Sequence, residues 1–393
     1  MRFGARIALV VTLAVSVVAC KRPPPEARSK QAQAPAVEVA GGETSPVTPQ
    51  AQTPNVSKTT FPRGDGPAHA ALAVDDRMFG PPTVLGNLAI YPVTSRSQVD
   101  VGPLVSLDEA LAKGDAEIRE NSGGGTVNQL VIDNKGSIPI FVLAGTVVKG
   151  GNQDRQIGQD FIIESKKTTP VDAFCVEHGR WNGQRNGQVT SGKFDSSGVV
   201  ATSKVRAAGQ YKKSQSEVWS NVSSTNAANR KTSSSDTLMA TIDDAAIVKE
   251  RTALVAQIDG ALATVTPQTD LVGVAYAIDG EVRGARWFSH HKVFELARKK
   301  VVASIALDAI TERAAARTAG RPPSTKPTPA PAAVDAFVKN VEAQAIKEQR
   351  DTPAANVNEY KESADGFGSK TMMKGAAGKP ASAKPLSNDY LKK

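Results

Sequence analysis

Residues 127–177 read VNQLVIDNKGSIPIFVLAGTVVKGGNQDRQIGQDFIIESKKTTPVDAFCVE, and this stretch decides the fold class. Apolar runs of a few residues alternate with turn residues such as Asn-Lys-Gly and Lys-Lys. The pattern predicts strands at 127–133, 138–149 with a bend at Gly145, 160–164 and 169–177. Short strands at this spacing indicate an antiparallel β-sandwich or a jelly-roll-like block.

The sequence on either side of this strand block adds helices and one clear hairpin. Asp279-Gly280 lies between two apolar runs and supplies the positive φ angles that a two-residue turn needs. The apolar residues Phe294, Ala297, Val301 and Ile305 have helical spacing, and Ser289 before them is a suitable helix cap. The class is therefore α+β, with helices and a C-terminal hairpin plus helix on the strand block. Further predicted segments are a strand at 85–93, helices at 106–112, 202–223, 236–258 and 290–313, hairpin strands at 271–277 and 281–288, and a loop at 182–200.

The chain divides into four predicted regions. Residues 1–19 carry Arg2 and Arg6 before an apolar run, which is typical of a secretory signal peptide. Residues 20–83 are rich in Pro, Ala, Gln and Ser and are expected to be a disordered linker. The folded core is placed at 84–315. Residues 316–393, rich in Pro, Ala and Lys, are expected to be a mostly disordered tail with a possible short helix at 333–349.

The end of the signal segment, Val17-Val18-Ala19-Cys20, resembles the lipobox of bacterial lipoproteins. The resemblance implies cleavage before Cys20 and attachment of lipid, including palmitate, to that cysteine. An uncleaved membrane anchor is the alternative, but an apolar run from 7 to 19 is short for a bilayer span. We expect the membrane to be a partner through this lipid. Lys21, rather than Asp, favours the outer membrane of the bacterial cell envelope by resemblance to enterobacterial sorting.

Charge and cysteine usage exclude several classes of protein. The net charge is +9, but residues 84–315 hold 26 basic and 25 acidic side chains, so the surplus lies outside the core. We therefore expect no specific nucleic-acid binding. The chain has 2 cysteines, too few for a disulfide framework or a thiolate metal cluster. The adjacent His290 and His291 diverge on a helix, so no metal and no cofactor are expected.

Four segments together resemble a bacterial family of unknown function. They are Gly145–Arg155, Phe174–Trp181, Gln215–Trp219 and the hairpin Val272–Gly280. The family is the ADP-ribosylglycohydrolase and rhodanese-phosphatase-superfamily-associated protein domain, and the resemblance covers residues 85–315. Its name implies an association with ADP-ribose metabolism but no demonstrated activity.

Two polar groups of residues within these segments are candidate site residues. Glu177, Arg180 and Trp181 follow a predicted strand, where Glu177 could act as a base, Arg180 as an anion clamp and Trp181 as a stacking surface. A loop between strands supplies the second group, Gln153, Asp154 and Arg155. We expect 150–155 and 177–181 to form one polar rim. The alternative is that these charges only pair with one another and Trp181 seals the core.

Cys175 lies on a strand that is apolar on both faces. We expect it to be a structural thiol that behaves as a small hydrophobe. The alternative is a nucleophile activated by His178, although His178 falls on the other face of the strand.

These observations predict a lipid-anchored envelope protein that is a binding or interaction module. Its partner at the rim would be a small anionic or sugar-like ligand, or another envelope protein. The alternative is a hydrolase or transferase of nucleotide or ADP-ribose-like substrates, with Glu177 and Arg180 in the reaction.

Overall fold

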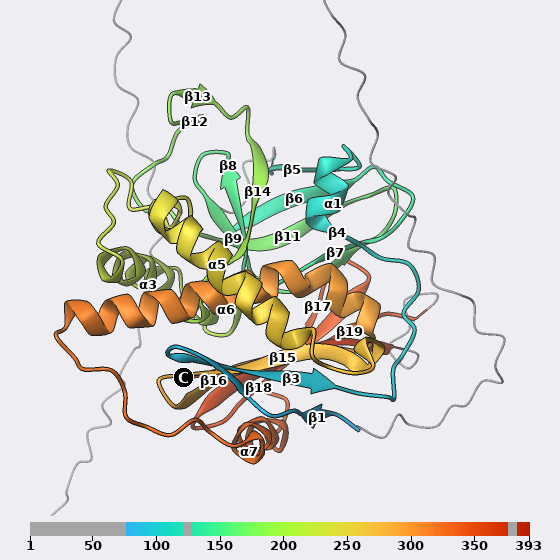
Figure 1. Cartoon of the computed structure of the whole chain (residues 1–393). Coiled ribbons are helices and arrows are strands. Elements are labelled where there is room, and N and C mark those ends of the chain that lie inside the picture. Colours follow the sequence, from blue (N-terminus) through green and yellow to red (C-terminus); the bar gives the residue numbers. More distant parts are fainter. Residues whose placement is uncertain (1–75, 122–127, 376–382) are drawn as a thin grey trace, which may run out of the picture. The chain divides into compact units, whose positions relative to one another are not determined.

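A computed structural model describes residues 76–121, 128–375 and 383–393 of the chain. The predicted signal peptide, Cys20 and most of the predicted linker lie outside these residues. Figure 1 shows a large sheet and a small barrel with helices between and around them. All described residues belong to one compact unit.

The larger β-structure is a nine-stranded antiparallel sheet. Its strands follow the order β1-β3-β15-β16-β20-β19-β18-β17, with β2 paired to β3. The strands are β1 (Met78–Phe79), β2 (Thr83–Leu85), β3 (Leu88–Thr94), β15 (Leu271–Ile278), β16 (Glu281–Phe288), β17 (Glu348–Asp351), β18 (Asn356–Glu362), β19 (Gly366–Met373) and β20 (Lys384–Lys392).

The predicted sandwich is replaced by a closed barrel. Six strands close in the order β11-β6-β5-β14-β8-β9, and their inward side chains form a separate apolar core that includes Ile118, Ile132 and Phe194. The barrel strands are β5 (Ala116–Glu120), β6 (Gln129–Asn134), β8 (Thr146–Gly150), β9 (Arg155–Ile157), β11 (Lys167–Cys175) and β14 (Lys193–Val200). A short sheet of β4 (Val105–Ser106), β7 (Ile140–Val142) and β10 (Phe161–Ile163) lies beside it.

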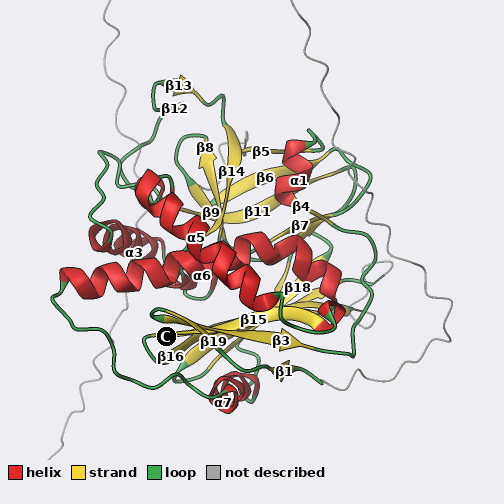
Figure 2. Cartoon of the chain, in the orientation of Figure 1, coloured by secondary structure: helices red, strands yellow, loops and turns green. Residues whose placement is uncertain are grey.

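The helices fill the space between the two β-structures and cover the outer face of the sheet (Figure 2). Helix α6 contacts both β15 and β14, so the sheet and the barrel share one core around it. On the opposite face of the sheet, α7 packs over Tyr91, Trp287 and Tyr390. The helices are α1 (Leu107–Ala112), α2 (Ser203–Gln210), α3 (Gln215–Ala228), α4 (Met239–Ile242), α5 (Ala245–Leu262), α6 (His291–Thr318) and α7 (Pro331–Glu342), with a 3-10 turn at Gln268–Asp270.

The predicted hairpin is confirmed and two helix predictions need correction. Asp279 and Gly280 have φ of 53° and 76° and join β15 to β16. The last core helix begins at His291, and the side chain of His290, not that of Ser289, accepts from the amide of Lys292. The helix predicted at 202–223 is two helices separated by Tyr211–Ser214, and the one predicted at 236–258 is α4 and α5.

The loop predicted at 182–200 contains three strands. β14 closes the barrel by pairing with both β5 and β8. The sequence of β14 does not show a strand pattern, because only Phe194, Val199 and Val200 are buried apolar residues and the remaining positions are polar or Gly. The other two strands, β12 (Gln184–Arg185) and β13 (Gln188–Val189), form a small hairpin that projects from the barrel in Figure 1.

The expected disordered tail and the core boundary at 315 are also wrong. Within 316–393 the structure contains α7 and strands β17 to β20, which are four of the nine strands of the large sheet. The predicted helix at 333–349 corresponds to α7, which ends at Glu342. Sheet pairing satisfies backbone groups whatever the side chains are, so a Gly-, Ser- and Lys-rich segment can extend a sheet that is already present. Gly368 is required there, since a Cβ would lie 2.8 Å from Val341 of α7.

Buried ion pairs hold the sheet and barrel together. Asp160, which precedes β10, accepts hydrogen bonds from Arg286 of β16 and Ser387 of β20, each at 2.7 Å. Nearby, Arg206 of α2 pairs with Asp389 of β20, and both side chains are under 10% exposed. These contacts position the tail strands against the core.

Candidate functional site

The predicted rim exists at one end of the barrel. The loop 151–154, the end of β11, the β12–β13 hairpin and the segment 233–237 meet there. Glu177 and Thr237 form an isolated antiparallel bridge that ties two of these pieces together. The sequence pieces that suggested a site are therefore adjacent in space.

Asp154 is the centre of the rim and is completely buried. Its carboxylate accepts hydrogen bonds from the Gly150 amide at 3.0 Å, the Thr237 hydroxyl at 2.8 Å and Arg185 Nε at 3.0 Å. Arg180 Nη2 is a further 3.4 Å away. These contacts use the lone pairs of both carboxylate oxygens, so Asp154 is held by four separate parts of the chain.

Glu177 is similarly enclosed, with 3% of its surface exposed. It accepts from the Asp154 amide at 2.9 Å, the Ser235 hydroxyl at 2.6 Å and Arg180 Nε at 3.0 Å. These three contacts orient the Glu177 carboxylate inward. The shared Glu177–Arg180–Asp154 cluster that the sequence predicted is thus present.

Arg180 completes this cluster through backbone oxygens as well as carboxylates. Its guanidinium donates to Gly150 O at 2.9 Å, Gly151 O at 2.8 Å and Asn182 O at 3.0 Å. At Gly150 the backbone lies directly against Lys193 of β14, which is possible because glycine has no side chain. A Cβ at Gly150 would lie 2.3 Å from Lys193 O. Arg180 therefore fastens the glycine turn to the end of β11.

Arg155 differs from the other charged residues of the rim. It belongs to β9, shares the inward face of Ile157, and is 0% exposed. Its Nη1 donates to Gln153 O at 2.9 Å, but Nε and Nη2 are buried with no hydrogen-bond acceptor among the described residues. Its nearest carboxylate is Glu120, at 4.0 Å from Nη2, and the half-buried Trp181 ring lies 5.7 Å from the guanidinium carbon.

The remaining predicted residues lie around Arg155. Gln153 is 3% exposed and donates to His178 O at 3.3 Å. Cys175 is paired with Arg155 across β11 and β9 and is fully buried. The Gln215 side chain clamps the Cys175 backbone, accepting from its amide at 2.9 Å and donating to its carbonyl at 2.8 Å.

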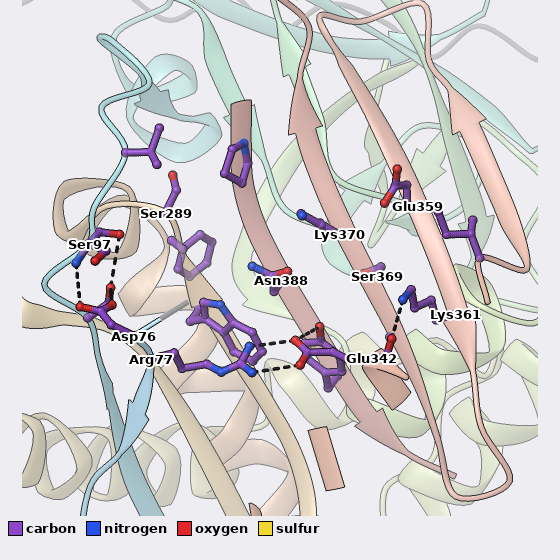
Figure 3. Close-up of a pocket in the computed structure, with 18 residues that line it drawn as sticks. Asp76, Arg77, Ser97, Ser289, Glu342, Glu359, Lys361, Ser369, Lys370 and Asn388 are labelled. Carbon is purple, nitrogen blue, oxygen red and sulfur yellow. Dashed lines mark hydrogen bonds and ion pairs between the residues drawn. The ribbon is translucent and has the colours of Figure 1, made fainter. Parts of the chain in front are cut away.

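Sequence reasoning missed a second candidate site. A cavity of about 410 Å³ lies on the α7 face of the large sheet, between α7 and the chain after β3 (Figure 3). Its residues come from 76–99, 287–289 and 342–390. The last of these ranges lies in the predicted tail, and the first begins in the predicted linker with Asp76 and Arg77. The apolar residues Leu386, Tyr390 and Leu391 and the helical stripe within Val334–Val341 were the available signals for structure there.

Neither region has the features of a metal centre or a membrane span. No group of three or more His, Cys, Asp or Glu side chains in the described ranges is placed to hold a metal ion. Among the same residues, none of the helices combines the length and the apolar character needed to cross a bilayer.

The fold and rim define an α+β protein in which a small barrel, closed at one end by a buried charge cluster, is joined to a nine-stranded sheet. The chain belongs to the family of the ARG and Rhodanese-Phosphatase-superfamily-associated Protein domain, whose model matches residues 77–378. This range confirms the resemblance and includes most of the tail strands. Comparison with curated proteins and with solved structures finds no match to this chain.

Proposed function

We propose that this chain is a lipid-anchored bacterial envelope protein that acts as a binding module, and that its ligand presents an anionic oxygen group to Arg155 at the barrel rim. The lipid anchor rests on the signal-like residues 1–19 and on Cys20. The ligand class rests on the rim.

The observation that supports this proposal most directly is that Arg155 Nε and Nη2 are buried without a hydrogen-bond acceptor among the described residues. Nε and Nη2 form the side of a guanidinium that binds a carboxylate or phosphate in a bidentate manner. Leaving such buried donors without acceptors costs about 1–3 kcal/mol. Glu120 at 4.0 Å balances the charge but is too distant for a hydrogen bond. A bound oxyanion would supply the missing acceptors.

Access to this edge depends on the covering residues. Trp181 is half-buried and lies against the guanidinium, and the projecting β12–β13 hairpin follows it in the chain (Figure 1). Entry of an anion therefore requires Trp181 to move outward. Its ring would then be free to contact an apolar part of the ligand.

Binding is better supported than catalysis at this rim. The alternative hydrolase or transferase would use Glu177 and Arg180, and both have their hydrogen bonds directed into the protein. A general base must reach the proton that it removes, and Glu177 is 3% exposed with Ser235, Arg180 and a backbone amide around it. The same contacts support a structural role for these two residues.

Thermal unfolding of the purified chain in phosphate, sulfate, acetate and chloride at equal ionic strength tests this function. We expect phosphate or a carboxylate to raise Tm of the wild type and not of Arg155→Gln. Arg119→Gln is the matched control, because Arg119 follows the inward Ile118 on β5 and faces outward. An equal Tm shift in Arg155→Gln, or no anion effect on the wild type, would reject the Arg155 site.

The anchor has its own test. Cys20→Ala should leave an unprocessed precursor, and the processed wild type should fractionate with the outer membrane. Normal processing and membrane retention of Cys20→Ala would remove the lipoprotein proposal without affecting the rim proposal.

A further inference from the structure

We infer that the 410 Å³ groove on the α7 face of the large sheet is a second binding site, and that it takes a small zwitterion, an amino acid or short peptide with a free ammonium and a free carboxylate. This inference is independent of the rim function. The volume is within the range of small-molecule sites.

A row of side chains across four neighbouring strands makes the floor of the groove. Glu359 of β18 pairs in register with Lys370 of β19, Lys370 with Asn388 of β20, and Asn388 with Trp287 of β16. Residues in register on adjacent strands face the same side of a sheet. Figure 3 shows Glu359, Lys370 and Asn388 along one face of these strands.

One wall of the groove has its polar groups satisfied. Arg77 donates to both oxygens of Glu342 at 2.8 and 3.0 Å, and the Tyr390 hydroxyl donates to Glu342 at 2.8 Å. Lys361 donates to the Glu342 backbone oxygen at 2.5 Å. Figure 3 shows these bonds on the α7 side of the cavity. This wall is therefore preformed.

The part of the lining next to Arg77 is fixed in a similar way. Asp76 accepts from the Ser95 hydroxyl at 2.5 Å and from the amides of Arg96 and Ser97 at 3.0 Å each. Burial opposes the charged form, but the hydrogen bonds from Ser95 and Arg96 outweigh it and lower the pKa of Asp76. Asp76 is thus committed to holding the chain that enters the sheet.

The floor and the back keep unused polar groups. In the part of the chain that the structure describes, Glu359 and Lys370 form no ion pair, and no hydrogen bond uses the Asn388 side chain. Ser289 Oγ, at the back of the groove, is buried without a partner among the same residues. Lys370, Glu359, Asn388 and Ser289 therefore offer one ammonium, one carboxylate, one amide and one hydroxyl that the described residues leave unused.

This set of groups favours a zwitterion over other ligands. A simple anion would meet Glu359 as well as Lys370, and a simple cation would meet Lys370 as well as Glu359. A sugar usually needs an open aromatic face, but Trp287 is 7% exposed and is in contact with Tyr390, Arg77 and Phe79. A ligand with both charges satisfies the two strand partners at once.

Calorimetric titration with triglycine, N-acetyl-triglycine and triglycine amide tests the inference. The wild type should bind triglycine and lose about tenfold or more in affinity for either blocked form. Glu359→Gln should no longer distinguish triglycine from N-acetyl-triglycine, and Lys370→Gln should no longer distinguish it from the amide. Each variant removes recognition of one end only.

Lys347→Gln is the control, since Lys347 pairs with Glu362 outside the groove, and it should bind as the wild type does. No binding of triglycine, equal binding of the blocked peptides, unchanged behaviour of both groove variants, or tight binding of N-acetylglucosamine in their place would overturn the inference. The phosphate-dependent Tm shift at Arg155 should persist in both groove variants, which separates failure here from failure of the rim function.

Discussion

The rim and the groove contain the same types of charged residue and use them in opposite ways. At the rim, Asp154, Glu177 and Arg180 direct their hydrogen bonds at one another and at the backbone. In the groove, Glu359 and Lys370 are in register on adjacent strands and form no ion pair within the described residues. The rim cluster is buried, whereas the groove pair reaches solvent.

This difference shows how little the presence of charged residues alone says about function. A buried carboxylate must find partners or pay a large desolvation penalty, so a dense buried cluster is first a structural requirement. A solvated pair has no such requirement, and its groups remain available to a ligand. Within the rim, Arg155 is the exception, because part of its buried guanidinium has no acceptor among the described residues.

The largest expected effect is at the centre of the rim. Asp154→Ala removes the partner of Arg180 and Arg185 and should lower the free energy of unfolding by about 3–5 kcal/mol, measured by urea denaturation. The separate variant Arg180→Lys should also be less stable than the wild type, because one ammonium cannot reach all the backbone and carboxylate acceptors of the Arg180 guanidinium. Lys204→Gln, which breaks an exposed pair with Glu312, should cost less than about 1 kcal/mol. A small loss in Asp154→Ala would show that the rim is not structural.

A smaller effect is expected on the wall of the groove. Glu342→Gln keeps the shape but removes the charge opposite Arg77, whose side chain is 6% exposed. The expected loss is about 2 kcal/mol, since charged hydrogen bonds contribute more than neutral ones. Glu359→Gln on the floor of the same groove should change stability by no more than about 0.5 kcal/mol. Equal losses in the two variants would contradict the distinction between wall and floor.

Cys175 should contribute about 1 kcal/mol to the stability of the barrel. Cys175→Ala leaves a small void beside Arg155 in the barrel and should lower stability by that amount, while the anion-dependent Tm shift remains. A bulky alkylating reagent should label the native thiol far more slowly than the unfolded chain. Rapid native labelling would revive the nucleophile hypothesis.

The smallest effect is the pH dependence at Asp76. Because the folded state lowers the pKa of Asp76, the charged form stabilises the fold above the ordinary pKa of 3.8, and this contribution is lost as pH falls below it. Asp76→Asn should remove this acid-dependent component, of less than about 1 kcal/mol for a group that is still partly exposed. Denaturation curves of both proteins between pH 6 and pH 3 measure it. An unchanged pH profile would assign the acid sensitivity elsewhere.

The sequence by itself determined the local elements and the membership of the rim. Asp279-Gly280 specified a hairpin, and the apolar stripe after His290 specified α6, because turn geometry and helical periodicity depend on neighbouring residues. The pairing of Glu177, Arg180 and Asp154 was also foreseeable, because charges at strand ends and on a buried loop must find partners. The sequence did not show that Arg155 would be buried with Nε and Nη2 lacking an acceptor among the described residues.

Tertiary structure alone decided the closure of the barrel, the fate of the tail and the existence of the groove. β14 closes the barrel, and β17 to β20 extend the sheet, through backbone hydrogen bonds that leave little trace in composition. The groove combines Asp76, Trp287, Glu342 and Lys370 from four distant parts of the chain. Local patterns report only near neighbours, so the sequence could not show that the apparent linker and tail would meet on one face of the sheet.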